Sequence, residues 1–392
     1  MKIGLIAAYN NNYGSLLQVY ALQQVLQNLS YETEIIRYRK RNAFVQFMRL
    51  FNGPLLKMKL KDRGKFYITK LFHKDIYRSL QIREEQFRRF RETHLRFSER
   101  YHARKELEDA FRNGPYFVAL LGSDQVWNPI NYGTHFYTME QVPDSCYKIA
   151  YAPSFGVKTI PGYQTRGTAK YLRRIQDISV REAQGAHIVH QLTGRDVPVV
   201  CDPTLLIGRE EWDRLKGDRP LQTGEYIFCY FLGNNPGQRE TVKDFAKRHG
   251  CRIVALQHLD EFIKADVGFA DDALFDVGPA EFINLIANAA YVFTDSFHGS
   301  IFSILYGRRF VTFPRFGARR QSGTNSRIEN LFQLFGIQNR WNPNGEALDG
   351  VIETGLPESI ADAILSLRDR SLAYLTGSLK AAEAYYDENH SR

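Results

Sequence analysis

Short apolar runs alternate with longer stretches whose apolar residues recur at helical spacing, and this alternation constrains the fold most. Residues 2–8 form the first apolar run, and residues 16–29 form the first helical stretch after a polar turn. Strand, turn and helix repeated in this order predict parallel sheets covered by helices. The expected fold class is therefore α/β, built from Rossmann-like doubly wound domains.

The alternation runs along the chain twice, and 392 residues are enough for two domains. Glycine and proline interrupt the pattern over residues 205–224, which we take as the boundary. We expect an N-terminal domain over residues 1–210 and a C-terminal domain over residues 220–340, facing each other across a cleft. Helices are expected to close the chain over residues 355–392.

Basic residues are concentrated in one segment. The formal net charge is +9, but residues 37–112 hold 22 basic and 9 acidic residues, whereas the rest of the chain holds 30 basic and 34 acidic ones. We expect a basic helical insertion over residues 41–112. Bulky apolar residues lie between its charges over residues 44–60, a mixture typical of an interfacial helix on an anionic membrane.

Two alternatives for this segment stay open. The insertion packs on the body of the protein with a solvated basic face, or its charge attracts nucleic acid. No helix-turn-helix, zinc-finger or RNP-type pattern supports nucleic acid, so we expect no nucleic-acid partner.

The first apolar run is too short for a signal peptide, and no run is long enough to span a membrane. We expect a cytoplasmic protein, with peripheral contact at the inner face of the membrane as an open alternative. The cysteines form no Cys-x-x-Cys pair, and the histidines show no metal-ligand spacing. The chain has no Gly-x-Gly-x-x-Gly motif, which would indicate a dinucleotide-binding site, so we expect no cofactor. Metal dependence stays open.

Ligands of parallel sheets bind beyond the carboxyl ends of the strands, so the turns that follow strands are the candidate sites. In the first turn, Asn12, Tyr13 and Ser15 offer hydrogen bonds to sugar hydroxyls, although turn formation and helix capping explain them equally well. After the strand that ends at residue 121, Asp124 is placed as a general base and Trp127 as a platform for a sugar ring. The alternative for Asp124 is that it caps a turn.

Arg181 follows a later strand and offers a planar fork for a carboxylate or a phosphate. Asp202 precedes Pro203, where it either caps the chain or orients a neighbouring arginine. These two residues are candidates for binding an anionic donor.

The turn after the strand at residues 291–294 is the main candidate. Gly299 and Ser300 open an apolar helix, and we expect their N–H groups and the helix dipole to bind an anion beside His298 and Ser296. Arg327 opens a further helix and is expected to bring a guanidinium to the same place.

Six motifs together resemble the polysaccharide pyruvyl transferase family over roughly residues 1–335. They are NYG at 12–14, GSDQVW at 122–127, SVRE at 179–182, DPTLL at 202–206, TDSFHGS at 294–300 and SRI at 326–328. The resemblance implies a glycosyltransferase-B-like pair of domains, with the donor held by the C-terminal half and the acceptor by the N-terminal half. It also implies phosphoenolpyruvate as the donor and a pyruvate ketal on a sugar of a bacterial surface polysaccharide, such as a capsule or exopolysaccharide.

By the same resemblance, His298 matches the histidine of the donor site and Arg181 a donor-binding arginine. One position departs from the pattern, because other branches have an arginine where this chain has Ser296. We therefore expect Arg327 to supply the missing charge. The basic insertion is not covered by the resemblance.

The hypothesis drawn from the residues and the resemblance is that His298 protonates phosphoenolpyruvate and Asp124 helps a sugar hydroxyl to attack it. The acceptor is open, and a lipid-linked oligosaccharide fits if the insertion binds the membrane. A second enzyme hypothesis makes the donor a nucleotide sugar bound by His298 and Arg327. A third makes the protein a non-catalytic scaffold or nucleic-acid-binding protein built around the basic segment.

Overall fold

The chain folds into two compact units. The computed structural model describes residues 1–38, 73–259, 262–315, 323–342 and 348–390. The first domain consists of Met1–Asn42, Arg91–Ile207 and Ala361–Arg392, and the second of Ala43–Phe90 and Gly208–Ile360. The chain thus passes between the units near residue 207. The C-terminal helical region, which the sequence set apart, belongs to the first domain.

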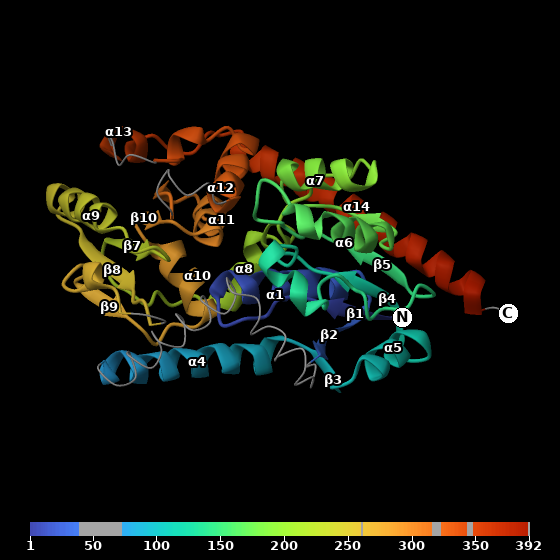
Figure 1. Cartoon of the computed structure of the whole chain (residues 1–392). Helices are drawn as coiled ribbons and strands as arrows, with labels where there is room; N and C mark the ends of the chain where they lie inside the picture. The colour runs from blue at the N-terminus through green and yellow to red at the C-terminus, as the bar shows by residue number, and fades with distance from the viewer. Residues whose placement is uncertain (39–72, 260–261, 316–322, 343–347, 391–392) are drawn as a thin grey trace. The chain divides into compact units, whose positions relative to one another are not determined.

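The first domain contains a six-stranded parallel sheet with the order β3-β2-β1-β4-β5-β6 (Figure 1). This is the strand order of a Rossmann fold. The strands are β1 (Lys2–Ile6), β2 (Glu32–Tyr38), β3 (Phe97–Tyr101), β4 (Tyr116–Leu121), β5 (Tyr147–Ala150) and β6 (Asp177–Ile178). β4 is buried along its whole length, as expected of a central strand covered on both faces.

Helices connect and cover these strands. They are α1 (Tyr13–Asn28), α4 (Lys74–His94, of which the part up to Phe90 belongs to the second domain), α5 (Arg104–Arg112), α6 (Gly162–Arg173), α7 (Ala183–Thr193) and α14 (Ile360–His390), together with the short helices η2 (Pro129–Thr134) and η3 (Pro203–Leu205). α14 is held by hydrogen bonds, since the amide of Cys201 donates to the Ser371 hydroxyl over 2.9 Å and Arg368 Nε donates to the carbonyl oxygen of Leu205 over 2.7 Å.

The second domain contains a five-stranded parallel sheet with the order β11-β10-β7-β8-β9. Its strands are β7 (Tyr226–Tyr230), β8 (Arg252–Leu256), β9 (Asp272–Leu274), β10 (Tyr291–Thr294) and β11 (Arg309–Thr312). Its helices are α8 (Arg209–Lys216), α9 (Pro236–His249), α10 (Pro279–Asn288), α11 (Phe297–Leu305), α12 (Gly323–Leu334) and α13 (Leu348–Glu353), with the short helices η4 (Lys264–Asp266) and η5 (Gln338–Arg340). The predicted fold class, two Rossmann-like domains, is confirmed.

Two edge strands were missed by the sequence analysis. β3 reads Phe-Ser-Glu-Arg-Tyr and lies within the segment that we expected to be helical throughout. β9 has three residues and begins with an aspartate. Edge strands are short and carry charges, so they lack the apolar run that marks central strands. The helical interpretation of residues 41–112 therefore holds for α4 and α5 but is wrong for β3.

The predicted membrane contact falls on residues 44–60, which lie outside the described residues. Among the residues that the structure does describe, no helix has both the length and the apolar character needed to cross a bilayer. The predicted cleft between the two domains stays a prediction.

Candidate functional site

In each domain, an aspartate lies at the point where the strand order reverses. In the first domain this point lies between β1 and β4, and in the second between β7 and β10. Asp124 follows β4 and Asp295 follows β10, so both lie beyond the carboxyl ends of central strands. Ligands of doubly wound sheets bind at such points, which makes these two places the candidate sites.

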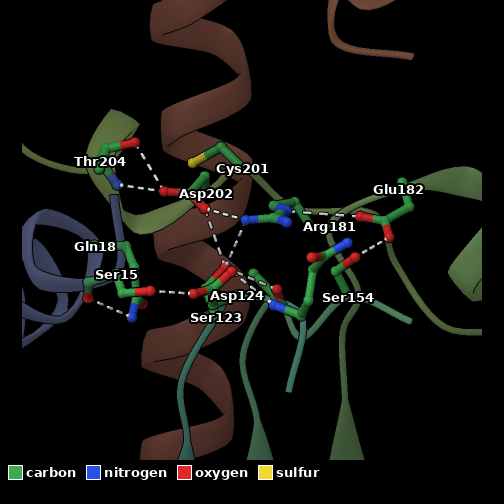
Figure 2. A network of polar contacts seen from close by, with 12 residues as sticks. Ser15, Gln18, Ser123, Asp124, Ser154, Arg181, Glu182, Cys201, Asp202 and Thr204 are labelled. Carbon is green, nitrogen blue, oxygen red and sulfur yellow. Dashed lines mark hydrogen bonds and ion pairs between the residues drawn. The ribbon is translucent and has the colours of Figure 1, made fainter. Parts of the chain in front are cut away.

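In the first domain, Asp124 is joined to the start of α1. The Ser15 hydroxyl donates to Asp124 Oδ2 over 2.5 Å, and Ser15 itself is buried (Figure 2). Asn12 is the N-cap of α1, because its side-chain oxygen accepts from the Ser15 amide over 3.3 Å. The structure therefore brings together three residues that we selected from the sequence: Asn12, Ser15 and Asp124.

The backbone of Asp124 is strained, its carboxylate is held by hydrogen bonds, and the residue as a whole is partly exposed. Its φ is +83°, a value that is uncommon for residues other than glycine. Oδ1 accepts from the amide of Gln125 over 2.8 Å, so both carboxylate oxygens are oriented. Asp124 remains partly exposed, unlike the neighbouring Ser123. A strained backbone that aims a partly exposed carboxylate is typical of a functional site.

Arg181 and Asp202 form a buried ion pair next to Asp124. Arg181 Nη1 lies 2.7 Å from Asp202 Oδ2, and the two side chains are 2% and 1% exposed. The Ser123 hydroxyl lies 3.1 Å from the same carboxylate oxygen. Oδ1 of Asp202 accepts from both the amide and the hydroxyl of Thr204. Asp202 thus does both things that the sequence left open, since it caps η3 and orients an arginine.

The charge of Arg181 is maintained by its surroundings. Burial alone would lower its pKa, but the carboxylates of Asp202, Glu182 and Asp124 outweigh burial and raise it. Glu182 Oε2 lies 3.6 Å from Arg181 Nε, and the other Glu182 oxygen accepts a hydrogen bond from the Ser154 hydroxyl (Figure 2). Arg181 is therefore a permanent cation that lies among three carboxylates.

Tyr137 lies near Asp124 and was missed by the sequence analysis. Burial, followed by the charges of Asp124 and Tyr9, raises the pKa of Tyr137 to about 12. Its phenol therefore stays protonated and can donate a hydrogen bond. No strand-end pattern marks Tyr137, because it lies in an irregular segment after η2. Tyr9, in contrast, lies in the predicted first turn.

Two of the predicted acceptor-binding side chains are buried in the core. Trp127 is 4% exposed, packs against Phe155 and Tyr171 with ring centroids 5.2 and 5.8 Å away, and donates from its indole nitrogen to the Tyr137 carbonyl oxygen. Tyr13 is 3% exposed. Core packing accounts for both residues, and a sugar ring has no open face of Trp127 on which to stack, so we leave them out of the proposed acceptor site.

In the second domain, two amides that we expected to bind an anion are already used. Ser296 is the N-cap of α11, where its hydroxyl accepts from the Gly299 amide over 3.2 Å. The Ser300 amide donates to the Ser296 carbonyl oxygen over 3.0 Å, and the Ser300 hydroxyl lies 2.8 Å from Thr312 Oγ1. The prediction that the amides of Gly299 and Ser300 bind the anion is therefore wrong, because normal helix capping satisfies both.

The first turn of α11 still carries the predicted imidazole and a cation beside it. His298 is 8% exposed, and its ring meets the Phe297 ring edge-on at 5.3 Å. The Arg327 guanidinium lies 5.7 Å from the centroid of the same Phe297 ring. His298 and Arg327 thus both contact the Phe297 ring, and their role in binding a donor stays a prediction.

Asp295 binds the turn after β7 and was not selected from the sequence. Its Oδ1 accepts from the amide of Leu232 and its Oδ2 from the amide of Gly233, each over 2.7 Å. Asp295 is fully buried. Gly233 approaches so closely that a Cβ atom there would lie 2.9 Å from Asp295 Oδ2 and from the Arg315 carbonyl oxygen. A carboxylate of the chain itself therefore occupies the turn at which Rossmann domains hold phosphates.

Arg315 is a further cation near α11. It follows β11, its Nη2 lies 3.4 Å from the Asp295 carbonyl oxygen, and its Nε lies 4.0 Å from Asp295 Oδ1. Its side chain is 22% exposed. Its position after a strand, like that of Asp295, is the signal that could have identified it. Within the described ranges, no group of three side chains is arranged to hold a metal ion.

Several solved structures are similar to this chain over most of its length. The UDP-GlcNAc 2-epimerase of Methanocaldococcus jannaschii matches with a TM-score of 0.53 and 10% identity, over 91% of this chain and 93% of that one. UDP-GlcNAc 2-epimerase from Neisseria meningitidis, bound to UDP-GlcNAc, matches with a TM-score of 0.49 and 10% identity, over 95% and 100% of the two chains. The glycosyltransferase SnogD of Streptomyces nogalater matches with a TM-score of 0.44 and 12% identity, over 98% and 99%.

At 10% identity, the similarity to the epimerase of Methanocaldococcus jannaschii, whose TM-score is above 0.5, describes the fold alone. No curated protein matches the chain. The model of the polysaccharide pyruvyl transferase family matches residues 12–315, which is well over half of the chain and includes both candidate sites. The chain therefore belongs to the polysaccharide pyruvyl transferase family.

Proposed function

We propose that the protein transfers the pyruvyl group of phosphoenolpyruvate to a sugar of a bacterial surface polysaccharide or of its lipid-linked precursor. The product is a cyclic pyruvate ketal, and phosphate is released. The family match over residues 12–315 carries this proposal. A histidine and two arginines of the second domain, His298, Arg315 and Arg327, support it.

The donor is held by the second domain. Phosphoenolpyruvate carries a carboxylate and a phosphate, and arginine is well suited to bind both. Arg327 contacts Phe297 and Arg315 contacts Asp295, and both of these partners are close in sequence to His298. They replace the arginine that the family resemblance implies at the position of Ser296. The dipole at the start of α11 adds to the attraction.

The acceptor sugar is held by the first domain, where Asp124 accepts a proton from the attacking hydroxyl. The carboxylate is partly exposed, and the Ser15 hydroxyl fixes its direction at 2.5 Å. Asn12 and Tyr137 add groups that can bind sugar hydroxyls. The charge of Arg181 is already balanced by the carboxylate of Asp202. We therefore assign Arg181 the role of positioning Ser123 and Asp124, with donor binding as the alternative.

The proposed reaction needs neither a redox step nor a nucleotide. His298, as imidazolium, gives a proton to the methylene carbon, so the neighbouring carbon becomes electrophilic. One sugar hydroxyl attacks this carbon and loses its proton to Asp124. The carbon–oxygen bond to phosphate then breaks, and a second hydroxyl closes the ketal. In the net balance, one hydroxyl proton ends on the new methyl group and the other on phosphate.

The alternative hypothesis of a nucleotide-sugar donor has less support. In Rossmann domains the turn after the first strand binds phosphate through backbone amides. Here the amides of Leu232 and Gly233 donate to Asp295, which already supplies the negative charge. A diphosphate at this turn would have to displace a buried carboxylate. The phosphoenolpyruvate hypothesis does not require Asp295 to leave this turn.

The test is to incubate the purified protein with phosphoenolpyruvate and a panel of oligosaccharides. Phosphorus NMR follows the release of phosphate, and proton NMR follows the ketal methyl group. We expect one phosphate for each ketal formed, and none when nucleotide sugars replace phosphoenolpyruvate. Sugar transfer from a nucleotide sugar with no use of phosphoenolpyruvate would overturn the proposal.

A further inference from the structure

We propose that the first domain carries a second carbohydrate site, which binds an acidic sugar unit of the acceptor outside the hydrogen-bond network of Asp124. The identity of the ligand rests on the proposed function. The residues of this second site are different from those labelled in the network of Figure 2. It is carried by a polar cavity between η2 and α6.

The cavity measures about 480 Å³ and is lined by Arg104, Tyr132, Glu140, Asp144, Lys170 and Arg174, among others. Binding pockets for small molecules commonly measure about 300–1,000 Å³, so a sugar ring or two fits in size. Most small-molecule pockets have apolar walls, whereas this one is lined largely by charged side chains. Such a lining suits a ligand rich in hydroxyl groups.

The two carboxylates of the cavity are already bound within the protein. Asp144 Oδ1 lies 3.1 Å from Lys148 Nζ and 2.8 Å from Arg174 Nη2. Burial would raise the pKa of Asp144, but these two cations lower it, so the carboxylate stays ionised. Glu140 Oε2 lies 3.1 Å from His135 Nδ1. Both carboxylates can still accept hydrogen bonds from sugar hydroxyls on their exposed sides.

When the ion-pair partners of the lining residues are included, the cations outnumber the carboxylates by one. The four cations are Arg104, Lys148, Lys170 and Arg174, and the three carboxylates are Glu108, Glu140 and Asp144. Arg104 Nε pairs with Glu108 over 2.6 Å, whereas Lys170 is exposed on α6. Across the described part of the chain, no carboxylate lies within 4.0 Å of the Lys170 ammonium group. The cavity therefore favours a ligand with one negative charge, and Lys170 is the group that would meet it.

Tyr132 forms an aromatic wall of the cavity, and its ring can lie there only because residue 167 is a glycine. A Cβ atom at Gly167 would lie 1.8 Å from the Tyr132 hydroxyl, so any larger residue would displace the ring. Burial, followed by the charge of Glu140, raises the pKa of Tyr132, so its hydroxyl stays a donor. An apolar ring face next to hydrogen-bonding groups complements a sugar, which has an apolar face and a polar edge.

Together these features select a hexose that bears a carboxylate. A hexuronic acid and a hexose that already carries a pyruvate ketal share this chemistry. The acceptor of this family is a polymer, so an acidic unit next to the reacting sugar, or one modified earlier, can occupy the cavity while another unit reacts. The site would then favour long acidic acceptors over short neutral ones.

The experiment measures binding by NMR titration in the absence of phosphoenolpyruvate. The probes are a pyruvylated methyl hexoside, a methyl hexuronide, the uncharged methyl hexoside and inorganic phosphate. We expect both acidic sugars to bind at least about tenfold more tightly than the uncharged one, because a hydrogen bond to a charged group is stronger than a neutral one. Lys170→Ala should abolish this difference, and Gly167→Ala should weaken binding of all sugars.

The matched control is Arg166→Ala, which removes an exposed cation from the same helix outside the cavity. It should leave binding unchanged, as should His298→Ala, which tests the donor site alone. Equal binding of charged and uncharged sugars, no effect of Lys170→Ala, or equal binding of phosphate would overturn the proposal. Retained binding without any pyruvyl transfer would instead contradict the proposed function.

Discussion

At the scale of single residues, two aspartates with similar positions have different environments. Asp124 follows β4 and stays partly exposed, with a serine hydroxyl as its partner. Asp295 follows β10 and is fully buried, with two backbone amides as its partners. Asp124 is therefore suited to take a proton from a substrate, whereas Asp295 stabilises the turn after β7.

His298 is the residue on which the proposed chemistry depends. Removing a general acid costs about 10²- to 10⁴-fold in rate, so we expect His298→Ala to lower pyruvyl transfer by this factor. The unfolding temperature should fall by no more than about 4 °C, because the substitution removes one buried ring but leaves the helix cap in place. The assay is phosphate release, and His187→Ala, at an exposed position on α7, serves as the control. A variant that turns over at the normal rate would exclude His298 as the acid.

Asp202 compensates the buried charge of Arg181. Asp202→Asn should destabilise the first domain by about 3–5 kcal/mol, because the substitution leaves Arg181 buried without its closest carboxylate. Denaturant unfolding measures the effect, and Asp196→Asn at a 94% exposed carboxylate should change stability little. The double variant Arg181→Met, Asp202→Leu should recover much of the loss. If the single variant is as stable as the natural protein, the ion pair contributes nothing.

At the scale of elements, the corner between β10 and α11 (residues 294–299) is tightly packed, because the first turn of α11 lies against the end of β10. A Cβ atom at Gly299 would lie 2.7 Å from Thr294 Oγ1 and 3.2 Å from Thr294 Cγ2. The Thr294 hydroxyl in turn donates to the Tyr230 carbonyl oxygen over 2.6 Å, so it has little room to move. The corner therefore requires glycine for packing, although glycine weakens helices in general.

We expect Gly299→Ala to destabilise the second domain by about 1–3 kcal/mol and to lower activity, since the corner carries His298. Gly377→Ala on α14 is the matched control, because nothing lies within 4 Å of its added methyl group. That variant should instead gain up to about 1 kcal/mol, as alanine is the better helix former. Thermal unfolding of both variants provides the comparison. An unchanged unfolding temperature of Gly299→Ala would show that the backbone before α11 can shift to make room for the methyl group.

At the scale of the whole molecule, the chain leaves its first domain and returns to it at the end. α14 belongs to the first domain, where Ser371 and Arg368 bind the backbone at Cys201 and Leu205. Ring contacts extend the attachment, since Tyr385 lies 5.5 Å from Tyr147 and Tyr386 lies 6.2 Å from Phe117. The last helix is thus an integral part of a domain that begins more than 300 residues earlier.

Truncation after residue 360 should therefore weaken the first domain and spare the second. We expect hydrogen exchange of the amides of β4 to accelerate at least about tenfold, while β7 keeps its protection, because only β4 belongs to the domain that loses packing. Mass spectrometry of peptic fragments measures both strands in one sample. Equal loss of protection in β4 and β7 would contradict the assignment of α14 to the first domain.

The sequence by itself determined the alternation of strands and helices apart from β3 and β9, the two-domain class and the family. These features depend on local periodicity and on motifs, which are written along the chain. Asn12, Ser15 and Asp124 were selected because residues that follow parallel strands gather at one edge of the sheet, and hydrogen bonds join them in the structure. His298 and Arg327 were selected for the second domain, where both contact Phe297.

Only the tertiary structure decided which polar groups are left for a ligand. The amides of Gly299 and Ser300 are used by Ser296, the amides of Leu232 and Gly233 by Asp295, and Trp127 lies inside the core. Strand order, burial and ion pairing depend on contacts between residues far apart in the chain. A carboxylate that follows one strand can satisfy a turn that follows another only when the sheet has brought the two together.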